Sequence, residues 1–349
     1  MDYKMTQAIT DHIIREQRKI EKKRRMVLLI FAVACLVGLV LDVMTGPSML
    51  PINDVVEALL RLTGVEDTTQ TIVYDLRLPI ALMALLVGAS LGAGGAEMQT
   101  LLNNPMASPY TLGLAAAAGF GASLVIAFGC LGLPLQYAVP IGAFVMTMIA
   151  SAVLFLFASL KQFAAATLIL VGIALLFIFQ SLLSLVQFIA SPEVSQQILF
   201  WLFGNLNKAT WTNLAVVAVV STVCIVLLMR DGWQLTALRL GEERAAALGV
   251  NLTRLRIRTL ILVAMMTATA ISFVGVIGFI GLVAPHVARL LVGEDQRYFL
   301  PATMLAGAAF LSFSSVLSKV IIPGALFPVG IVTSFVGVPF LFWIIWSKR

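Results

Sequence analysis

Nine apolar runs, each about 20 residues long, alternate with short polar segments along this chain of 349 residues. A helix of about 20 residues is long enough to cross the hydrocarbon core of a bilayer. Because no water reaches that core, a spanning segment must satisfy its own backbone hydrogen bonds, which favours helices. The pattern therefore predicts an all-α polytopic membrane protein. The runs lie at residues 26–44, 78–102, 110–130, 135–159, 164–190, 212–229, 259–282, 299–318 and 327–346.

The distribution of basic residues adds a tenth pass. Residues 1–25 carry eight Lys and Arg, and the chain ends in Lys348 and Arg349. Basic residues flank membrane spans on the cytoplasmic side, so both ends are predicted to be cytoplasmic and the number of crossings even. The missing pass fits best at 283–293, as a short helix. We therefore expect a basic cytoplasmic tail at 1–25, followed by one ten-helix domain at 26–349.

Composition agrees with this class and removes several others. The chain is 60% hydrophobic and 11% charged, whereas soluble domains carry about a quarter charged residues. The net charge of +6 follows from the cytoplasmic basic segments and gives no reason to expect a nucleic-acid partner. Three cysteines within apolar runs lack the paired spacing of a disulfide framework or a metal site. No Gly-Lys pair occurs, so the chain has no P-loop with which to bind ATP.

Few ionisable residues interrupt the predicted spans. Glu97 lies near the cytoplasmic end of the second span, where it is either a polar residue at a helix end or a lining residue of a transport pathway. One such acid is thin support for ion coupling, so the energy for transport is expected to come from a partner. His286, which follows Pro285, is interpreted as a packing or hydrogen-bonding residue.

The segment "LRLGEERAAALGV" at 238–250 is unusually polar for this chain. The predicted topology places it in the cytoplasm, between the sixth and seventh spans. Glu242 and Glu243 suit the first turn of a short helix, and Gly249 is a typical helix stop. Ala245 and Leu248 would form a small apolar face. Two interpretations stay open, namely a docking helix for a soluble protein and an ordinary solvated loop helix.

Four motifs in order resemble those of the FecCD family of permeases. They are "RLPIALMALLVGASLGAGGAEMQTLLNNPMASPYTLGL", "LGEERAAALGV", "VGVIGFIGLVAPHVARLLVG" and "LFPVGIVTSFVGVPFLFWII", and the resemblance spans about residues 27–349. It implies a type II ABC importer permease fold with ten spans, paired with a second permease, either a copy or a homologue. Two cytoplasmic ATPase subunits that bind ATP and Mg, a substrate-binding protein and a bacterial cytoplasmic membrane are implied as well, with no cofactor in this chain.

The resemblance also assigns roles to individual residues. Residues 241–249 match the coupling helix that contacts the ATPase. Arg77 and Lys319 match outward-facing positions that dock the binding protein, although Lys stands where Arg is usual and Ile80 replaces another frequent Arg. Asn104 and Met106 match positions near the cytoplasmic gate, whereas Glu97 departs from the usual apolar or small residue. The expected coupling contacts are Gly241, Glu242, Glu243, Arg244, Ala245 and Leu248.

The sequence thus predicts the permease subunit of an ABC importer for an iron chelate, a ferric siderophore. A haem or cobalamin permease of the same family is the first alternative. An ion-coupled secondary carrier using Glu97 is the second, and a channel or structural role the third.

Overall fold

A computed structural model describes residues 2–48, 50–60, 66–129, 132–160, 165–322 and 327–347, with side chains described from residue 11 onward except 344, 345 and 347. Every regular element in these ranges is a helix. Seven helices are long and apolar enough to cross a membrane, and three shorter apolar helices accompany them. The long ones are α1 (Asp2–Met44), α4 (Leu78–Leu101), α6 (Leu135–Leu160), α7 (Ala165–Ile189), α9 (Trp211–Arg230), α12 (Leu252–Val274) and α14 (Gln296–Val320).

The three shorter apolar helices are α5 (Leu114–Phe128), α13 (Ile280–Val292) and α15 (Val329–Ser347). Ten apolar helices agree with the even number that the charge distribution requires, and the prediction of an all-α polytopic fold is confirmed. Six further helices are described, of which α3 and η1 run directly into α4. They are α2 (Ile52–Leu59), α3 (Asp67–Thr71), the π-helical turns of η1 (Ile72–Arg77), α8 (Pro192–Leu202), α10 (Gly232–Leu238) and α11 (Glu242–Ala247).

One predicted run proves to be two elements. The run at 259–282 is broken after Val274, where Gly275 takes a φ of 75° that favours glycine. The chain then crosses a short irregular link and starts α13 at Ile280. The tenth pass therefore begins three residues earlier than expected, since it was predicted to start at 283.

Helix α4 lies at the centre of the bundle, packed against α9, α12, α13 and α14. Glycines allow its backbone to approach two of these neighbours closely. A Cβ atom added at Gly88 would collide with the carbonyl oxygen of Gly307 in α14, and one at Gly95 would collide with that of Gly281 in α13. Small residues at such contacts are typical of helix packing in lipid. These contacts leave α4 little room to move independently of α13 and α14.

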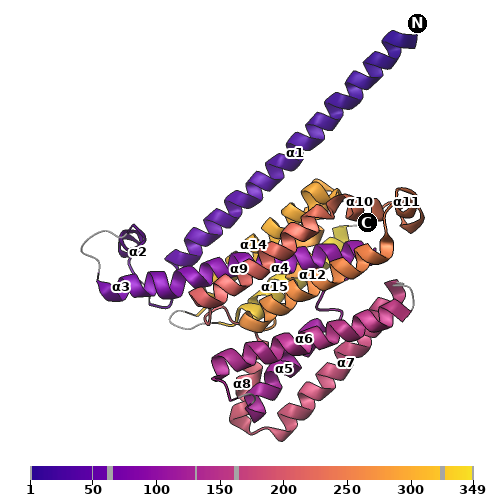
Figure 1. Cartoon of the computed structure of the whole chain (residues 1–349). Coiled ribbons are helices and arrows are strands. Elements are labelled where there is room, and N and C mark those ends of the chain that lie inside the picture. The colour runs from indigo at the N-terminus through magenta and orange to yellow at the C-terminus, as the bar shows by residue number, and fades with distance from the viewer. Residues whose placement is uncertain are drawn as a thin grey trace.

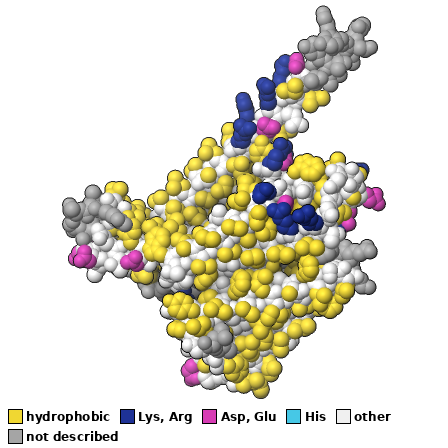
Figure 2. Space-filling model, in the orientation of Figure 1, with side chains coloured by type: hydrophobic (Ala, Val, Ile, Leu, Met, Phe, Trp, Pro, Cys, Tyr) yellow, Lys and Arg dark blue, Asp and Glu magenta, His cyan; other side chains and the backbone are white. Residues whose placement is uncertain are grey.

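The basic tail is continuous with the first span. Helix α1 has 43 residues, which at 1.5 Å per residue gives about 65 Å, twice the thickness of the hydrocarbon core. Figure 1 shows its N-terminal part projecting from the bundle, and Figure 2 shows Lys and Arg side chains along that part and at the adjacent end of the bundle. The division at residue 25 is therefore not marked by any break in the helix.

Candidate functional site

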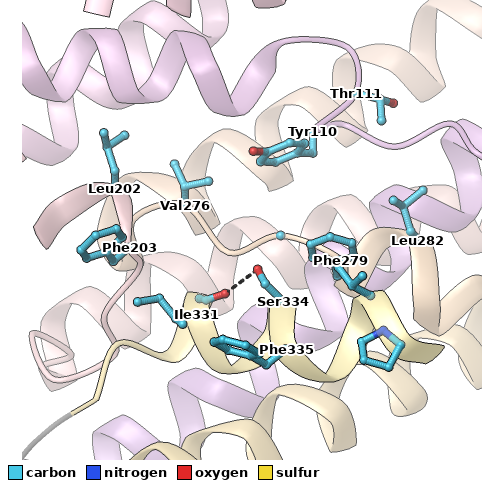
Figure 3. A pocket seen from close by; sticks show the side chains of 14 residues that line it. Tyr110, Thr111, Leu202, Phe203, Val276, Phe279, Leu282, Ile331, Ser334 and Phe335 are labelled. Atoms are coloured by element: carbon cyan, nitrogen blue, oxygen red, sulfur yellow. Dashed lines mark hydrogen bonds between the residues drawn. The ribbon is translucent and has the colours of Figure 1, made fainter. Parts of the chain in front are cut away.

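A cavity of about 700 Å³ opens between α15 and the irregular link that precedes α13. Tyr110 and Thr111, from the loop before α5, close one side, and Phe203 from the end of α8 closes another. Figure 3 shows the rings of Phe203, Phe279 and Phe335 around this space. Its size falls within the range of small-molecule sites, roughly 300–1,000 Å³.

Close backbone packing fixes the walls of this cavity. The amide of Gly330, at the start of α15, donates to the carbonyl oxygen of Phe203 at 3.1 Å. Ser334 Oγ donates to the Gly330 carbonyl oxygen at 2.9 Å, the bond drawn in Figure 3. Phe279 has a φ of 66°, a conformation rare for a bulky residue, and its Cβ and ring atoms fill the space against Gly337 of α15.

The lining is apolar and aromatic. Among the described residues that line the cavity, the polar side chains are the hydroxyls of Tyr110, Thr111 and Ser334, and none is charged. In the described part of the chain, no group of three or more His, Cys, Asp or Glu side chains lies close enough to hold a metal ion. The cavity can therefore contact apolar or aromatic surface and offer a few hydroxyl contacts, but its described walls supply no set of metal ligands.

The predicted coupling segment forms α11, Glu242–Ala247, with Gly241 before it at a φ of 104°. Leu248 is 53% exposed, and Glu243 and Arg244 also face solvent. Ala245 is fully buried, packed in the cluster that contains Leu235 of α10. The predicted apolar face of Ala245 and Leu248 is therefore split, because Ala245 anchors the segment and only Leu248 is available to a partner.

Glu242 is exposed but paired within the chain. Its Oε1 accepts a hydrogen bond from Arg256 Nη2 of α12, and the Arg256 side chain is only 7% exposed. The pair ties the first turn of α11 to a spanning helix. Of the two glutamates, Glu243 is thus the one whose described contacts leave it free for a partner.

A polar cluster, here called the arginine cluster, lies beside the coupling segment and consists of Arg239, Glu294, Arg289, Gln99 and Asn103. Arg239 follows α10 and pairs with Glu294, between α13 and α14. Glu294 also pairs with Arg289 of α13 at 3.1 Å. Arg289 donates to Gln99 of α4 at 2.9 Å, and Arg239 donates to Asn103, just beyond α4, at 3.3 Å. The cluster connects the entry to the coupling segment with both α4 and α13.

Two positive charges share one carboxylate in this cluster. Burial lowers the pKa of the Arg239 guanidinium, yet arginine stays charged at any physiological pH. Arg289 lies in the last turn of α13, and the C-terminal ends of helices stabilise positive charge. The excess charge is therefore partly balanced by the end of α13.

The three predicted gate residues lie outside the described cavity lining. Asn104 Oδ1 accepts a hydrogen bond from the Met106 amide at 2.9 Å, and the Met106 side chain is exposed. Glu97 is completely buried, and neither carboxylate oxygen has a hydrogen-bond partner. Its helical neighbours Ala93 and Ala96 pack on α9, α12, α13 and α14. The same segment does contribute to the cavity lining, but only at Tyr110, which follows Asn104 and Met106 in the chain.

The two predicted docking residues are buried at the opposite end of the bundle. Lys319 Nζ donates to Asp42 Oδ1 at 2.7 Å and to the Asp42 carbonyl oxygen at 3.0 Å, and Ser315 Oγ donates to the same carboxylate. Arg77 donates to the carbonyl oxygens of Val43 and Met44, each at 3.1 Å. Both cations therefore fasten the end of α1 instead of facing outward in this structure.

Comparison with known proteins decides the family. The model of the FecCD transport family matches residues 34–347. The chain belongs to the FecCD transport family. It is accordingly an ABC importer permease and a multi-pass membrane protein. Permeases of this family are not themselves enzymes, and their homologues work with ATPase and permease partners.

Several FecCD relatives align over most of the chain. The ferric enterobactin transport system permease protein FepD of Escherichia coli is 36% identical over 326 residues, covering 93% of this chain and 94% of FepD. The hemin transport system permease protein HmuU of Yersinia pestis is 34% identical, covering 82% and 86%. A solved structure described as an inward-facing conformation of a metal-chelate type ABC transporter matches with a TM-score of 0.82 and 30% identity, covering 93% of this chain and 100% of that one.

Sequence analysis missed the cavity and the arginine cluster of this FecCD permease. The glycines at 275, 278 and 281 could have indicated the break that carries Phe279. Glu294 could have been recognised because it and Asp295 are acids between two arginines, Arg289 and Arg297. Its partner Arg289 lies only five residues earlier, whereas Arg239 could not have been found because 55 residues separate it from Glu294.

Replacing Lys319 by Ala is expected to destabilise the permease. It leaves the Asp42 carboxylate buried without its cation, a change that typically costs about 3–5 kcal/mol. We expect a lower melting temperature in detergent, partly restored by adding Asp42→Asn, and no change for Lys208→Ala, which removes an exposed cation. An unchanged melting temperature together with weaker binding of the substrate-binding protein would instead support the docking role.

Proposed function

We propose that this FecCD permease imports a ferric siderophore. The supporting observation is a cavity with aromatic and hydroxyl-bearing walls and no charged side chain among its described lining residues. Iron that arrives wrapped in an organic chelator needs no ligands from the protein, so the described lining suits such a cargo. The relation to an enterobactin permease over 93% of the chain points the same way. Haem and cobalamin remain the alternatives, because the family includes a hemin permease.

The cavity becomes a complete pathway when a second permease covers α15. On that helix Phe335, Phe342 and Trp343 are 74%, 69% and 60% exposed. They extend the apolar surface of the cavity beyond this chain. A second copy or a homologous permease packed there would enclose the cargo between two similar walls, and a substrate-binding protein would deliver it from the outer side. Both ends of the chain lie in the cytoplasm in this arrangement.

Two ATPase subunits drive the cycle through the coupling segment. Glu243, Arg244 and Leu248 provide the contact, while Gly241, Glu242 and Ala245 fix the segment on the permease. Movement of the segment pulls on Arg239 and, through the arginine cluster, on α4 and α13. Phe279 directly precedes α13 and α4 leads to Tyr110, so both walls of the cavity respond. Asn104 and Met106 lie in the connection from α4 to Tyr110 and would move with it.

At the outer end, Arg77 and Lys319 contribute to docking of the substrate-binding protein indirectly, because they are buried beneath the docking surface. By holding the end of α1 against α4 and α14, they fix the platform formed by α2, α3 and η1. The binding protein would then recognise the exposed residues of that platform. Glu97 belongs to the packing of α4 in this scheme and carries no ion.

Transport by the purified complex tests the proposed cargo. The permease, its ATPase and its binding protein would be reconstituted in vesicles and offered ⁵⁵Fe-loaded catecholate, hydroxamate and citrate chelates, with hemin and cyanocobalamin as competitors. We expect saturable, ATP-dependent accumulation of a ferric siderophore. Accumulation of hemin or cobalamin alone would support the first alternative. Uptake that continues without ATP and stops when the proton gradient is dissipated would support a carrier.

Charge reversal at Glu243 tests the coupling contact. Glu243→Lys places a positive charge in the first turn of α11 and removes an exposed acid that is available to a partner. We expect recovery of the ATPase with the affinity-purified permease to fall at least severalfold, with an unchanged melting temperature. Glu57→Lys, the same change at an exposed position of α2 near the other end of the bundle, is the matched control. Equal ATPase recovery from both variants would contradict the proposed contact.

A further inference from the structure

Exposed apolar residues form a single stripe along the membrane part of α1. Met26, Leu29, Val33, Leu36 and Val40 are all exposed, and their spacing of three or four residues places them on one helix face. The rest of the bundle packs on a different face, where Cys35 donates to the Leu305 carbonyl oxygen and Gly38 fits against Ser312. The stripe therefore faces lipid.

Basic residues continue this stripe, with the same spacing, beyond the apolar part. Arg15, Arg18 and Lys22 lie three and four residues apart, and Lys22 precedes Met26 by four. All are exposed, as is Lys19 beside them, which also pairs with Glu16 at 2.7 Å. Figure 2 shows Lys and Arg side chains of the projecting helix on the side away from the bundle. The face of α1 that contacts lipid tails thus turns basic where the helix leaves the hydrocarbon core.

The opposite face of the extension has a different character. It carries Ile13, Gln17, Ile20 and Arg24. Arg24 points to the bundle, where it pairs with Asp295 at 3.3 Å and lies 5.2 Å from the centre of the Tyr298 ring. Because the basic stripe points away from α14, a protein bound beneath the bundle at the coupling segment would meet the other face.

The depth of the basic stripe fits lipid headgroups. At 1.5 Å per residue, Lys22 lies about 6 Å and Arg15 about 16 Å beyond Met26. The headgroup layer is roughly 5–7 Å thick, and at physiological salt a charge acts over a further distance of about 8 Å. Lys22 therefore lies within the headgroups, Lys19 and Arg18 lie close enough to attract them, and Arg15 lies at the outer limit of this distance.

We propose that Arg15, Arg18, Lys19 and Lys22 form a binding surface for anionic phospholipid headgroups of the cytoplasmic leaflet. The surface fixes the depth and direction of α1, whose other face supports α14. The proposal rests on the cytoplasmic orientation of the N-terminus proposed above, but on no assumption about the cargo. Each cation near an anionic surface is expected to strengthen binding about fivefold.

Energy transfer to labelled lipid tests this surface locally. A donor dye would be placed at Ile14→Cys in a Cys130→Ser background, since Cys35 and Cys224 are buried. The intact permease would be placed in neutral nanodiscs containing a small fraction of acyl-chain-labelled phosphatidylglycerol or phosphatidylcholine. We expect apparent association with phosphatidylglycerol to be at least about fivefold stronger at low salt, and the difference to disappear at high salt.

Two variants distinguish an effect of the basic stripe from an effect of the net charge. The preference for phosphatidylglycerol should be abolished in the neutralised variant, which carries Arg18→Gln, Lys19→Gln and Lys22→Gln. The relocated variant keeps the net charge but moves two cations to the opposite face of the helix, by Arg18→Gln, Lys22→Gln, Ile13→Lys and Gln17→Lys. It should also lose most of the preference for phosphatidylglycerol. No preference in the parent protein, or an equal preference in the relocated variant, would overturn the proposal. So would unchanged lipid binding in the neutralised variant with loss of the ATPase, because the stripe would then bind protein. If the proposed cargo is wrong and the protein does not transport a siderophore, the lipid-association measurements are unaffected.

Discussion

Glu294 forms ion pairs with two arginines that belong to different parts of the bundle, and the packing of the bundle end that carries α11 depends on this arrangement. Helices in lipid gain little from hydrophobic burial against one another, so polar contacts and close packing decide how they associate. Arg239 directly precedes the coupling segment, and Arg289 belongs to α13. Their amide partners, Asn103 and Gln99, lie at the end of α4. Removing the one carboxylate would leave two cations side by side.

Close helix packing allows a displacement in the arginine cluster to be transmitted to the cavity. Gly95 and Gly281 bring the backbones of α4 and α13 into direct contact, with no room for a side chain between them. Tightly packed interfaces shift between discrete arrangements and do not deform gradually. A displacement at Arg239 is therefore expected to move α4 and α13 together, and with them Phe279 and Tyr110 in the walls of the cavity. Arg77 and Lys319, at the opposite end of the bundle, hold the end of α1 against the same assembly.

Sequence patterns predicted the parts of this fold that depend on one element at a time. Span length and basic flanks each report a local requirement of the bilayer, and they predicted the helical class and the even number of passes. The pattern failed where two elements meet. Ala245 is buried because it packs against α10, and Lys319 is buried because it pairs with Asp42, which lies 277 positions earlier. The break at Gly275 was not predicted because both sides of it are apolar, although the glycines at 275, 278 and 281 mark it.

We propose that Arg239 and Glu294 act as one unit in coupling ATP hydrolysis to transport. The direct test is a double-mutant cycle of Arg239→Gln and Glu294→Gln in the reconstituted complex, measuring substrate imported per ATP hydrolysed. Residues that act as a unit give non-additive losses, so each single variant should import less substrate per ATP, and the double variant should be no worse than the poorer single. Additive losses, or a normal ratio in Glu294→Gln with the complex intact, would contradict the account.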